Sequence, residues 1–443
     1  MLLNKTLINT RSYTTFQKLG IPETVANHLK TNFGIKQATQ AQSKFIPAIL
    51  SGKDLFLRDA TGTGKSFGIA LTLASQPSCR TLYITPNQEL ATQINQWIQS
   101  LTSSNHIIVD TPAKLLRRIA DQSQQHEFNN LGRIVLDEAD QALRLPKRYA
   151  TLRQQQHRQQ HPKPAQLIMT SLFSPTSRFL HGDKRQLIVS SATLNRSLRH
   201  WMTQQGWLQD PLFIDITKGN QIPHHTTTDL QSTLEPRDTT NQLAAPVQHY
   251  CLMVSDDAIR NMTPPSNDAI KYSSLMESAA TTPRSTTFDD DDDRMLESIA
   301  ILHDLESLVL QNSVLFVDTS VSIADIQARL ASYDIQARDI REAMTMTASS
   351  SPPSTTRTLW IATEFTARGV DLPHISHVFI LGKPSSIASY IHMAGRTGRL
   401  NANGNISRGK VISLVRDHGK SEAKMMNMYN LMNIPIRSLE HVE

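Results

Sequence analysis

The chain has 443 residues, 39% of them hydrophobic, and a formal net charge of +6 at pH 7. That length exceeds one compact core, and no apolar run approaches the roughly 18 residues that a membrane-spanning helix needs. The two cysteines, Cys79 and Cys251, are too few and too widely separated for a disulfide framework or an ordinary structural zinc site. The basic balance favours an acidic partner, nucleic acid ahead of a membrane surface, although many proteins with such a modest excess bind neither.

The amino terminus combines basic and hydroxylated residues without acids. Lys5, Arg11 and Lys18 all precede the first carboxylate, which is Glu23. This bias is typical of a mitochondrial transit peptide, and an unstructured start that happens to lack acids is the alternative. We therefore expect residues 1–13 to be a transit segment that directs the protein to the mitochondrial matrix.

Short β-branched or aliphatic runs alternate with helical stretches in two parts of the chain. Such alternation predicts α/β domains with parallel sheets. We place them at residues 14–216 and 246–443, joined by a flexible linker rich in Thr, Gln and Pro at residues 217–245. The predicted strands are DLFL, TLYIT, HIIV, RIVL, QLIVS and LFIDI in the first domain, and VQHYCLMV, SVLFVD, TLWIAT, HVFIL and KVISLV in the second.

Two segments have the composition of loop insertions. Residues 151–164 are dense in Gln, His and Arg, and residues 255–293 are rich in Ser, Thr and Pro before they end in FDDDDD. A block of like charges usually stays solvated, so we assign no cation site to the aspartates. His157 and His161 have no cysteine or acidic partner at metal-ligand spacing, and we interpret them as solvated too.

A phosphate-binding loop is predicted directly after the first strand. The stretch RDATGTGKS stands between DLFL and the helical run FGIALTLASQ, and a glycine-rich turn in that place offers backbone amides and a helix dipole to phosphates. Lys65 is predicted to reach the terminal phosphates of ATP and Ser66 to offer its hydroxyl to Mg²⁺. Asp59 occupies a position where such loops usually have Gly or Ala. The predicted ATP-binding loop comprises Thr61, Gly62, Thr63, Gly64, Lys65 and Ser66.

A cluster of carboxylates, Asp137, Glu138 and Asp140, follows the predicted strand RIVL. In α/β ATPases an acid at the carboxyl end of a strand holds the nucleotide-bound Mg²⁺, and a neighbouring glutamate can orient or deprotonate the attacking water. We assign Asp137 to the metal and Glu138 to the water. An exposed acidic turn is the alternative, and the phosphate loop upstream weakens it.

The order of these motifs resembles the DEAD-box ATP-dependent RNA helicases over roughly residues 16–415. ATGTGKS, the letters DEAD at residues 137–140 and SSATL at residues 190–194 carry the resemblance. It implies two tandem RecA-like domains that close on ATP, Mg²⁺ and single-stranded RNA. The chain is most similar to fungal mitochondrial members linked to assembly of the large ribosomal subunit. That similarity implies rRNA and mitochondrial ribosome assembly intermediates as partners of a monomer, without a membrane.

The resemblance also assigns nucleotide-site roles outside these motifs. Phe16 and Gln42 match the aromatic residue and the glutamine that read adenine in the family. Asp371, in TEFTARGVDLP, matches the aspartate that touches the ATP ribose. Ser191 and Thr193 match residues that couple the nucleotide site to the RNA face.

The RNA-contacting motifs are matched less completely. Thr111 and Lys114 in TPAKL, and Thr363 in the second domain, fall at RNA-contacting positions of the family. In TPNQELA, Asn87 and Gln88 replace a threonine and an arginine. Only about twenty residues separate ELA from TPAKL, where the family usually has a longer segment that helps to hold RNA. The resemblance therefore implies a weaker or differently built grip on RNA.

The stretch IHMAGRTGRL contains two arginines, Arg396 and Arg399, among glycines. In the family this element reaches the γ-phosphate, so both arginines are assigned to the charge that develops during hydrolysis. Met393 stands where the family has an arginine. These departures leave an ATP-gated RNA clamp or assembly scaffold with little turnover as the alternative to a helicase.

Overall fold

The computed structural model describes residues 14–59, 61–121, 123–146, 150–174, 185–216, 247–262, 290–306, 312–345, 358–367, 372, 375–399, 407–440 and 442. Among these residues, those up to 216 form a first compact unit and those from 247 onward form a second. The predicted transit segment at residues 1–13, the linker at residues 217–245 and Asp371 lie outside the described residues.

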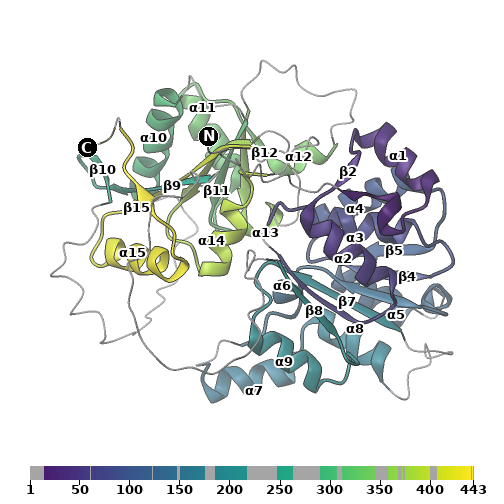
Figure 1. The fold of residues 1–443 in the computed structure, drawn as a ribbon. Helices are drawn as coiled ribbons and strands as arrows, with labels where there is room; N and C mark the ends of the chain where they lie inside the picture. Colours follow the sequence, from purple (N-terminus) through teal and green to yellow (C-terminus); the bar gives the residue numbers. More distant parts are fainter. Residues whose placement is uncertain are drawn as a thin grey trace, which may run out of the picture. The chain divides into compact units, whose positions relative to one another are not determined.

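A parallel sheet of six strands forms the centre of the first unit (Figure 1). The strand order is β5-β4-β6-β7-β3-β8, and each neighbouring pair is parallel. The sequences of such strands are almost continuously apolar, because helices cover both faces of the sheet. The strands are β3 (Leu55–Arg58), β4 (Thr81–Ile84), β5 (Ile107–Asp110), β6 (Arg133–Leu136), β7 (Gln186–Ser191) and β8 (Leu212–Asp215).

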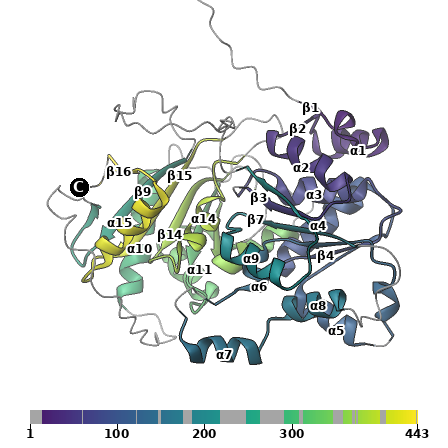
Figure 2. The same cartoon turned by 60° about the horizontal axis from the view of Figure 1, so that its bottom comes forward.

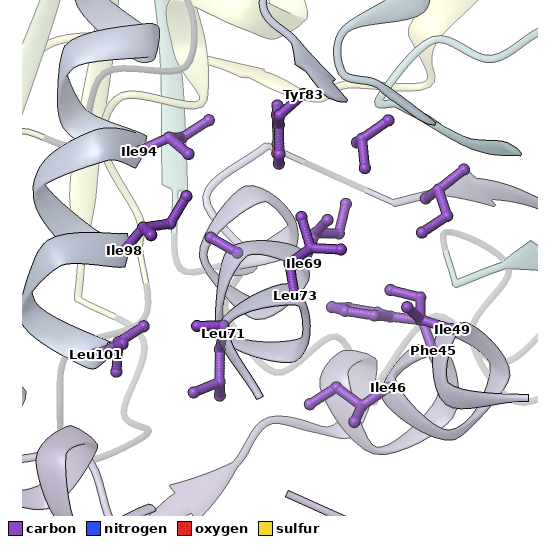
Figure 3. Packing of buried hydrophobic residues seen from close by; sticks show 14 of the residues in the cluster. Phe45, Ile46, Ile49, Ile69, Leu71, Leu73, Tyr83, Ile94, Ile98 and Leu101 are labelled. Carbon is purple, nitrogen blue, oxygen red and sulfur yellow. The ribbon is translucent and has the colours of Figure 1, made fainter. Parts of the chain in front are cut away.

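Alternate residues of each strand serve two cores on opposite faces of this sheet. Leu55 and Leu57 pack into one apolar cluster, whereas Phe56 between them packs into the other, as the period of two requires. Figure 3 shows the first cluster, where apolar side chains of α2, α3 and α4 converge. The helices of the unit are α1 (Glu23–Phe33), α2 (Gln40–Leu50), α3 (Lys65–Ala74), α4 (Gln88–Leu101), α5 (Pro112–Ala120), α6 (Ala139–Leu143), α7 (Leu152–Gln160), α8 (Pro164–Phe173) and α9 (Arg196–Gln204). The short elements are β1 (Thr14–Thr15), η1 (Gln17–Leu19), β2 (Gln37–Ala38) and η2 (Gln125–Phe128).

The second unit repeats this plan around an eight-stranded sheet. Its order is β10-β9-β15-β14-β11-β13-β12, with β16 also on β9, and only β10 is antiparallel to its neighbour. Val314 and Phe316 of β11 face one core and Leu315 and Val317 face the other. The strands are β9 (Val247–Val254), β10 (Ile259–Asn261), β11 (Asn312–Val317), β12 (Ala337–Asp339), β13 (Leu359–Thr363), β14 (Ile375–Leu381), β15 (Gly409–Arg416) and β16 (Ile436–Arg437). The helices are α10 (Asp290–Leu305), α11 (Ile323–Ser332), α12 (Ile340–Thr345), α13 (Glu364–Ala367), α14 (Ile387–Ala394) and α15 (Ser421–Met432).

The loop predicted at residues 151–164 is wrong, because that stretch forms α7 and the start of α8. The reason is local. Thr151 caps α7 by accepting a hydrogen bond from the backbone N–H of Gln154, whose side chain accepts one from the N–H of Thr151 in return. Gln and Arg are also good helix formers, so a polar composition did not exclude a helix.

The loop predicted at residues 255–293 is wrong at both ends. Its first residues turn into β10, which pairs with β9. Its last residues begin α10, and this helix is fixed further along by apolar residues that reach the core, such as Leu296 and Ile299. Residues 263–289 of that stretch lie outside the described part of the chain. Among the helices of the described residues, none has the length and apolar character that crossing a membrane requires.

A buried ionic cluster lies in the second unit just beyond the end of α10. The Glu306 carboxylate is 4% exposed, and its Oε2 atom lies 2.6 Å from Lys410 Nζ and 3.4 Å from His377 Nε2. The hydrogen bond from His377, assisted by Lys410 and opposed by burial, lowers the pKa of Glu306 to about 2. A carboxyl group whose pKa is lowered on folding stabilises the folded state above its unfolded pKa, and this stabilisation is lost as the pH falls toward the folded pKa.

We expect Glu306→Gln to destabilise the protein at pH 7 by about 1.5–3 kcal/mol, the usual contribution of hydrogen bonds to charged groups. The difference from wild type should shrink between about pH 4.5 and pH 2, because wild type alone loses the Glu306 charge there. Urea denaturation followed by circular dichroism at several pH values measures this difference. A difference that stays constant with pH would contradict the assignment.

Candidate nucleotide-binding site

The predicted phosphate loop lies between β3 and α3, as the sequence indicated. Gly64 caps α3 with a φ of 83°, a left-handed conformation that L side chains rarely adopt. A Cβ atom at Gly64 would also lie 3.0 Å from Gln42 Nε2, so glycine is required here for two reasons. Lys65 is 5% exposed, and its Nζ donates a hydrogen bond to the carbonyl of Asp59 at 3.0 Å. The lysine thereby spans the loop from its end to its start.

Gln42 supports the loop from α2. Its Oε1 accepts a hydrogen bond from the backbone N–H of Thr39 at 3.0 Å, and its Nε2 donates to the carbonyl of Gly64 at 3.3 Å. Phe16 is 2% exposed and packs in the apolar cluster to which Phe45 of α2 also belongs. The structure therefore brings Gln42 to the phosphate loop, and it places Phe16 in the apolar core of the first unit.

The Asp137 carboxylate accepts hydrogen bonds on both of its oxygens. The residue follows β6 directly and is fully buried. Its Oδ2 accepts hydrogen bonds from Ser66 Oγ at 2.6 Å and Tyr83 Oη at 2.8 Å, and its Oδ1 accepts from Ser190 Oγ at 2.5 Å and the backbone N–H of Glu138 at 3.0 Å. The predicted metal-binding pair, Ser66 and Asp137, is therefore in direct contact.

This donor set fits a magnesium nucleotide. Mg²⁺ prefers oxygen ligands and is usually held through one or two carboxylates together with substrate phosphates. The Ser66 hydroxyl and the Asp137 carboxylate supply such oxygens beside a loop with the strand-loop-helix form that binds phosphates. Ser66 and Asp137 are thus the described residues that would hold the metal, with Lys65 available to the phosphates.

Glu138 precedes α6 as its N-cap residue, and Asp140 lies in the first turn of that helix. Glu138 is 5% exposed and has a φ of 48°, an uncommon conformation for a residue with a side chain. Asp140 accepts hydrogen bonds from Ser191 Oγ and Thr193 Oγ1, each at 2.6 Å. The structure therefore brings both predicted coupling residues onto one carboxylate of the acidic cluster.

Sequence reasoning missed Tyr83 and Ser190 as partners of Asp137. Tyr83 belongs to the apolar run TLYI and carried no signal other than a core strand. Ser190 precedes Ser191 in SSATL, and that adjacency was the only available hint. Burial, followed by the neighbouring Asp137 charge, raises the pKa of Tyr83 well above its ordinary value. Its hydroxyl is therefore a permanent donor to the carboxylate at physiological pH.

The residues predicted to contact RNA in the first unit lie at the ends of helices. Thr111 precedes α5 as its N-cap residue. Lys114 is exposed, and its Nζ donates to Gln88 Oε1 at 2.5 Å. Asn87 caps α4 by accepting a hydrogen bond from the N–H of Leu90 at 2.9 Å. The two substitutions in TPNQELA thus have local roles, one as a helix cap and one as a partner of Lys114.

The predicted residues of the second unit form several hydrogen bonds within that unit. Thr363 is 8% exposed and its hydroxyl lies 3.2 Å from that of Thr366. Arg396 is 3% exposed and donates to the backbone carbonyls of His392 at 3.1 Å and Ala367 at 2.9 Å, which fastens α14 to α13. Arg399 is half-buried and donates to the carbonyl of Gly395 at 3.0 Å. Of the two arginines, Arg399 is the more accessible.

Met393 is a core residue. It is 6% exposed and packs in the apolar cluster that contains Tyr390 and Tyr429. An arginine in that place would carry its charged group into the core at a cost of several kcal/mol. The methionine is therefore explained by packing, and the interpretation of this position as a missing arginine at the nucleotide has no support from its surroundings.

Comparison with known proteins follows the same two units. A family model for the DEAD/DEAH box helicase matches residues 39–105 and 95–201, and a model for the helicase conserved C-terminal domain matches residues 302–401. Among solved structures, the Saccharomyces cerevisiae protein Dbp5 bound to RNA and ADP BeF3 aligns over 95% of this chain and 94% of its own, with a TM-score of 0.62 and 17% identity. Mss116p bound to ssRNA and AMP-PNP aligns over 96% of this chain and 79% of its own, with a TM-score of 0.61. The predicted pair of RecA-like domains with parallel sheets is confirmed.

The curated relatives are somewhat more similar in sequence than these solved structures, and they are longer than this chain. The ATP-dependent RNA helicase cyt-19 of Neurospora crassa, described as mitochondrial, is 24% identical over 434 residues, which cover 87% of this chain and 60% of that protein. The DEAD-box ATP-dependent RNA helicase CshA of Bacillus cereus is 22% identical over 425 residues, which cover 88% of this chain and 64% of CshA. The chain therefore spans less than two thirds of the length of these relatives.

We expect Tyr83→Phe to weaken nucleotide binding only when Mg²⁺ is present. The substitution keeps the buried ring and removes one of the donors that orient Asp137, which amounts to roughly tenfold in affinity for a hydrogen bond to a charged group. Titration with a fluorescent ADP analogue, with Mg²⁺ and with EDTA, measures both affinities. Tyr429→Phe is a matched control, because its buried hydroxyl donates to Ser413 in the other unit. Equal affinities for wild type and Tyr83→Phe in Mg²⁺ would refute the role of this hydroxyl.

Proposed function

Because the chain belongs to the DEAD/DEAH box helicase family, we propose that it is an RNA-dependent ATPase that works as an ATP-dependent RNA helicase. The observation that carries the proposal is the buried Asp137, which joins Ser66 of the phosphate loop to the strand that leads into Ser191. Asp137 would thus connect a magnesium nucleotide site to β7, as coupling of ATP hydrolysis to another site requires. An exposed acidic turn, the alternative interpretation of this cluster, would not make such buried hydrogen bonds.

Catalysis of ATP hydrolysis would depend on positioning and electrostatic stabilisation, because phosphoryl transfer requires little covalent chemistry from the protein. Lys65 would exchange the carbonyl of Asp59 for the terminal phosphates of ATP, and Ser66 would release Asp137 to face the metal. Mg²⁺, when bound, would neutralise charge on the phosphates. Glu138, at the carboxyl end of β6, would orient the attacking water and accept its proton.

Coupling to RNA would run through Asp140. This carboxylate accepts hydrogen bonds from Ser191 and Thr193 at 2.6 Å each, and it lies in the first turn of α6, directly after the turn that contains Glu138. A shift of that turn on hydrolysis therefore reaches the segment after β7. The second unit would supply Arg396 and Arg399 to the developing charge and Asp371 to the ribose. Thr111, Lys114 and Thr363 would contact RNA mainly through its phosphates and 2′-hydroxyls, with little sequence preference.

Retention of the hydrolytic residues favours turnover over a static RNA clamp. Lys65, Ser66, Asp137 and Glu138 are all present; Lys65 donates to the carbonyl of Asp59, and Ser66 donates to Asp137. We further propose that the RNA is mitochondrial rRNA and that the protein acts as a monomer on ribosome assembly intermediates in the matrix. Support for this setting comes from the acid-free amino terminus and from the relative in Neurospora crassa that is described as mitochondrial.

Glu138→Gln tests the proposed reaction. We expect single-stranded RNA to raise the rate of ATP hydrolysis by wild type. The variant should hydrolyse ATP about 10²- to 10⁴-fold more slowly than wild type in the presence of RNA, which is the range for a positioned general base. Binding of a fluorescent ATP analogue should be retained, because the substitution leaves the phosphate loop and Asp137 in place. Glu23→Gln, at an exposed position of α1, is the control for loss of one carboxylate. If the variant hydrolyses ATP at the wild-type rate, Glu138 has another role.

A fusion tests the proposed location. We expect the full chain with a fluorescent protein after Glu443 to enter mitochondria. Replacement of Lys5 and Arg11 by Gln should leave the fusion in the cytosol, because the basic residues are what a transit segment presents to its import machinery. Confocal microscopy with a matrix marker reads the result, and a wild-type fusion in the cytosol or nucleus would rule out the mitochondrial setting.

A further inference from the structure

Helix α7 contributes nothing to the core of the first unit. None of its residues is buried, and Leu152 at its start is 76% exposed. Figures 1 and 2 both show the helix at the margin of the first unit, beyond the helices that cover the sheet. Short helices are marginal in water unless packing supports them. An exposed polar helix without a buried face is therefore explained better by a partner than by folding.

The segment around α7 is basic and contains no acid. Residues 141–182 include Arg144, Lys147, Arg148, Arg153, Arg158, Lys163 and Arg178 but not one Asp or Glu, although the chain has 39 acidic residues in 443. At that frequency a run of this length would contain three or four carboxylates. Solvent-exposed helices often carry both positive and negative side chains, whereas this segment carries positive ones alone.

Side chains of α7 divide into an anchor and an outward face. Arg158 is half-buried and donates to the carbonyl of Leu143 at 2.6 Å and to that of His161 at 3.2 Å, which ties the helix to the end of α6. Arg153, His157 and His161 follow a spacing of four residues and so share one side of the helix. The two imidazole rings confirm this, because their centroids lie 4.6 Å apart. Arg153 and Lys163 are exposed.

We propose that α7 and Lys163 just beyond it form an additional RNA-binding surface, which contacts the phosphate backbone through Arg153 and Lys163. The proposal rests on the proposed function, since it presumes that the protein binds RNA. The chemistry of the surface fits phosphate: guanidinium, ammonium and glutamine amide groups are all donors, and phosphate oxygens are acceptors. A protein partner is less suitable, because protein interfaces depend on buried aromatic or aliphatic anchors and this helix offers only Leu152.

The position of the surface gives it a consequence for the nucleotide site. Arg158 holds α7 against Leu143, the last residue of α6, and α6 begins at Ala139 within the acidic cluster. RNA on α7 would therefore be separated from Glu138 by one short helix, α6, which itself contains Asp140. It would also add grip on RNA in a chain whose family RNA motif, TPNQELA, has Asn87 and Gln88 in place of a threonine and an arginine.

The test is the salt dependence of binding to fluorescent polyuridine, measured by anisotropy with the full chain. We expect Arg153→Gln combined with Lys163→Gln to weaken binding about 10- to 30-fold near 0.1 M salt. The slope of log affinity against log salt should fall in magnitude by about 1.4, since each phosphate contact on a single strand contributes about 0.7. ATP hydrolysis without RNA should stay at the wild-type rate, because neither residue belongs to the nucleotide site.

Two controls isolate the surface. Lys30→Gln combined with Lys44→Gln removes the same charge from exposed positions of α1 and α2, and should change the affinity less than twofold. Arg153→Lys combined with Lys163→Arg keeps both charges and should bind as wild type does. If the Arg153 and Lys163 variant matches the Lys30 and Lys44 variant, the proposal is overturned, and an acidic protein segment becomes the better occupant. Wild type that fails to bind polyuridine at all would instead remove the proposed function, and this inference with it.

Discussion

The first unit depends on how it stabilises one buried carboxylate. Asp137 is withdrawn completely from water, which is costly for a charged group unless hydrogen bonds replace the solvent. Ser66 of α3, Tyr83 of β4 and Ser190 of β7 supply three of those bonds, so the carboxylate joins a helix and two strands at the end of a third. The arrangement of the phosphate loop, the sheet and the segment after β7 follows from this single group.

Asp137 and Asp140 divide the work of the acidic cluster. The first faces the phosphate loop, and the second holds Ser191 and Thr193. Glu138 stands between them in a left-handed conformation that fixes the direction of the turn. Because the two carboxylates have separate hydroxyl partners, a change at the nucleotide can affect both the phosphate loop, through Asp137, and the segment of Ser191 and Thr193, through Asp140. This division gives the proposed coupling between ATP and RNA a physical route inside one unit.

Polar groups in the second unit mainly stabilise its own structure. Arg396 bonds to two backbone carbonyls and fastens α14 to α13, and Glu306 pairs with Lys410 and His377 across the start of two strands. Buried charges of this kind are retained only when their partners are in place. Arg399, half-buried beside Arg396, is the arginine that keeps access to solvent. The two arginines that were assigned to the phosphates thus differ in exposure, although they are only three residues apart.

The amino-acid sequence by itself determined the class of the fold and the identity of the phosphate site. Apolar runs are dictated by burial on both faces of a parallel sheet, so strands such as β6 and β9 were predicted almost to the residue. The phosphate loop has a fixed local geometry, and its letters are sufficient to predict it. Helix α7 was missed because its capping box was overlooked in a polar stretch.

Only the tertiary structure decided which side chains meet. Tyr83 lies within an apolar strand, and its role as a donor to Asp137 arises because β4 and β6 are neighbours in the sheet. The hydrogen bond from Arg396 to the carbonyl of Ala367 and the place of Met393 in the core likewise arise from the way α14 packs. Contacts between residues far apart in the chain depend on strand order and helix packing. A linear pattern carries no record of either.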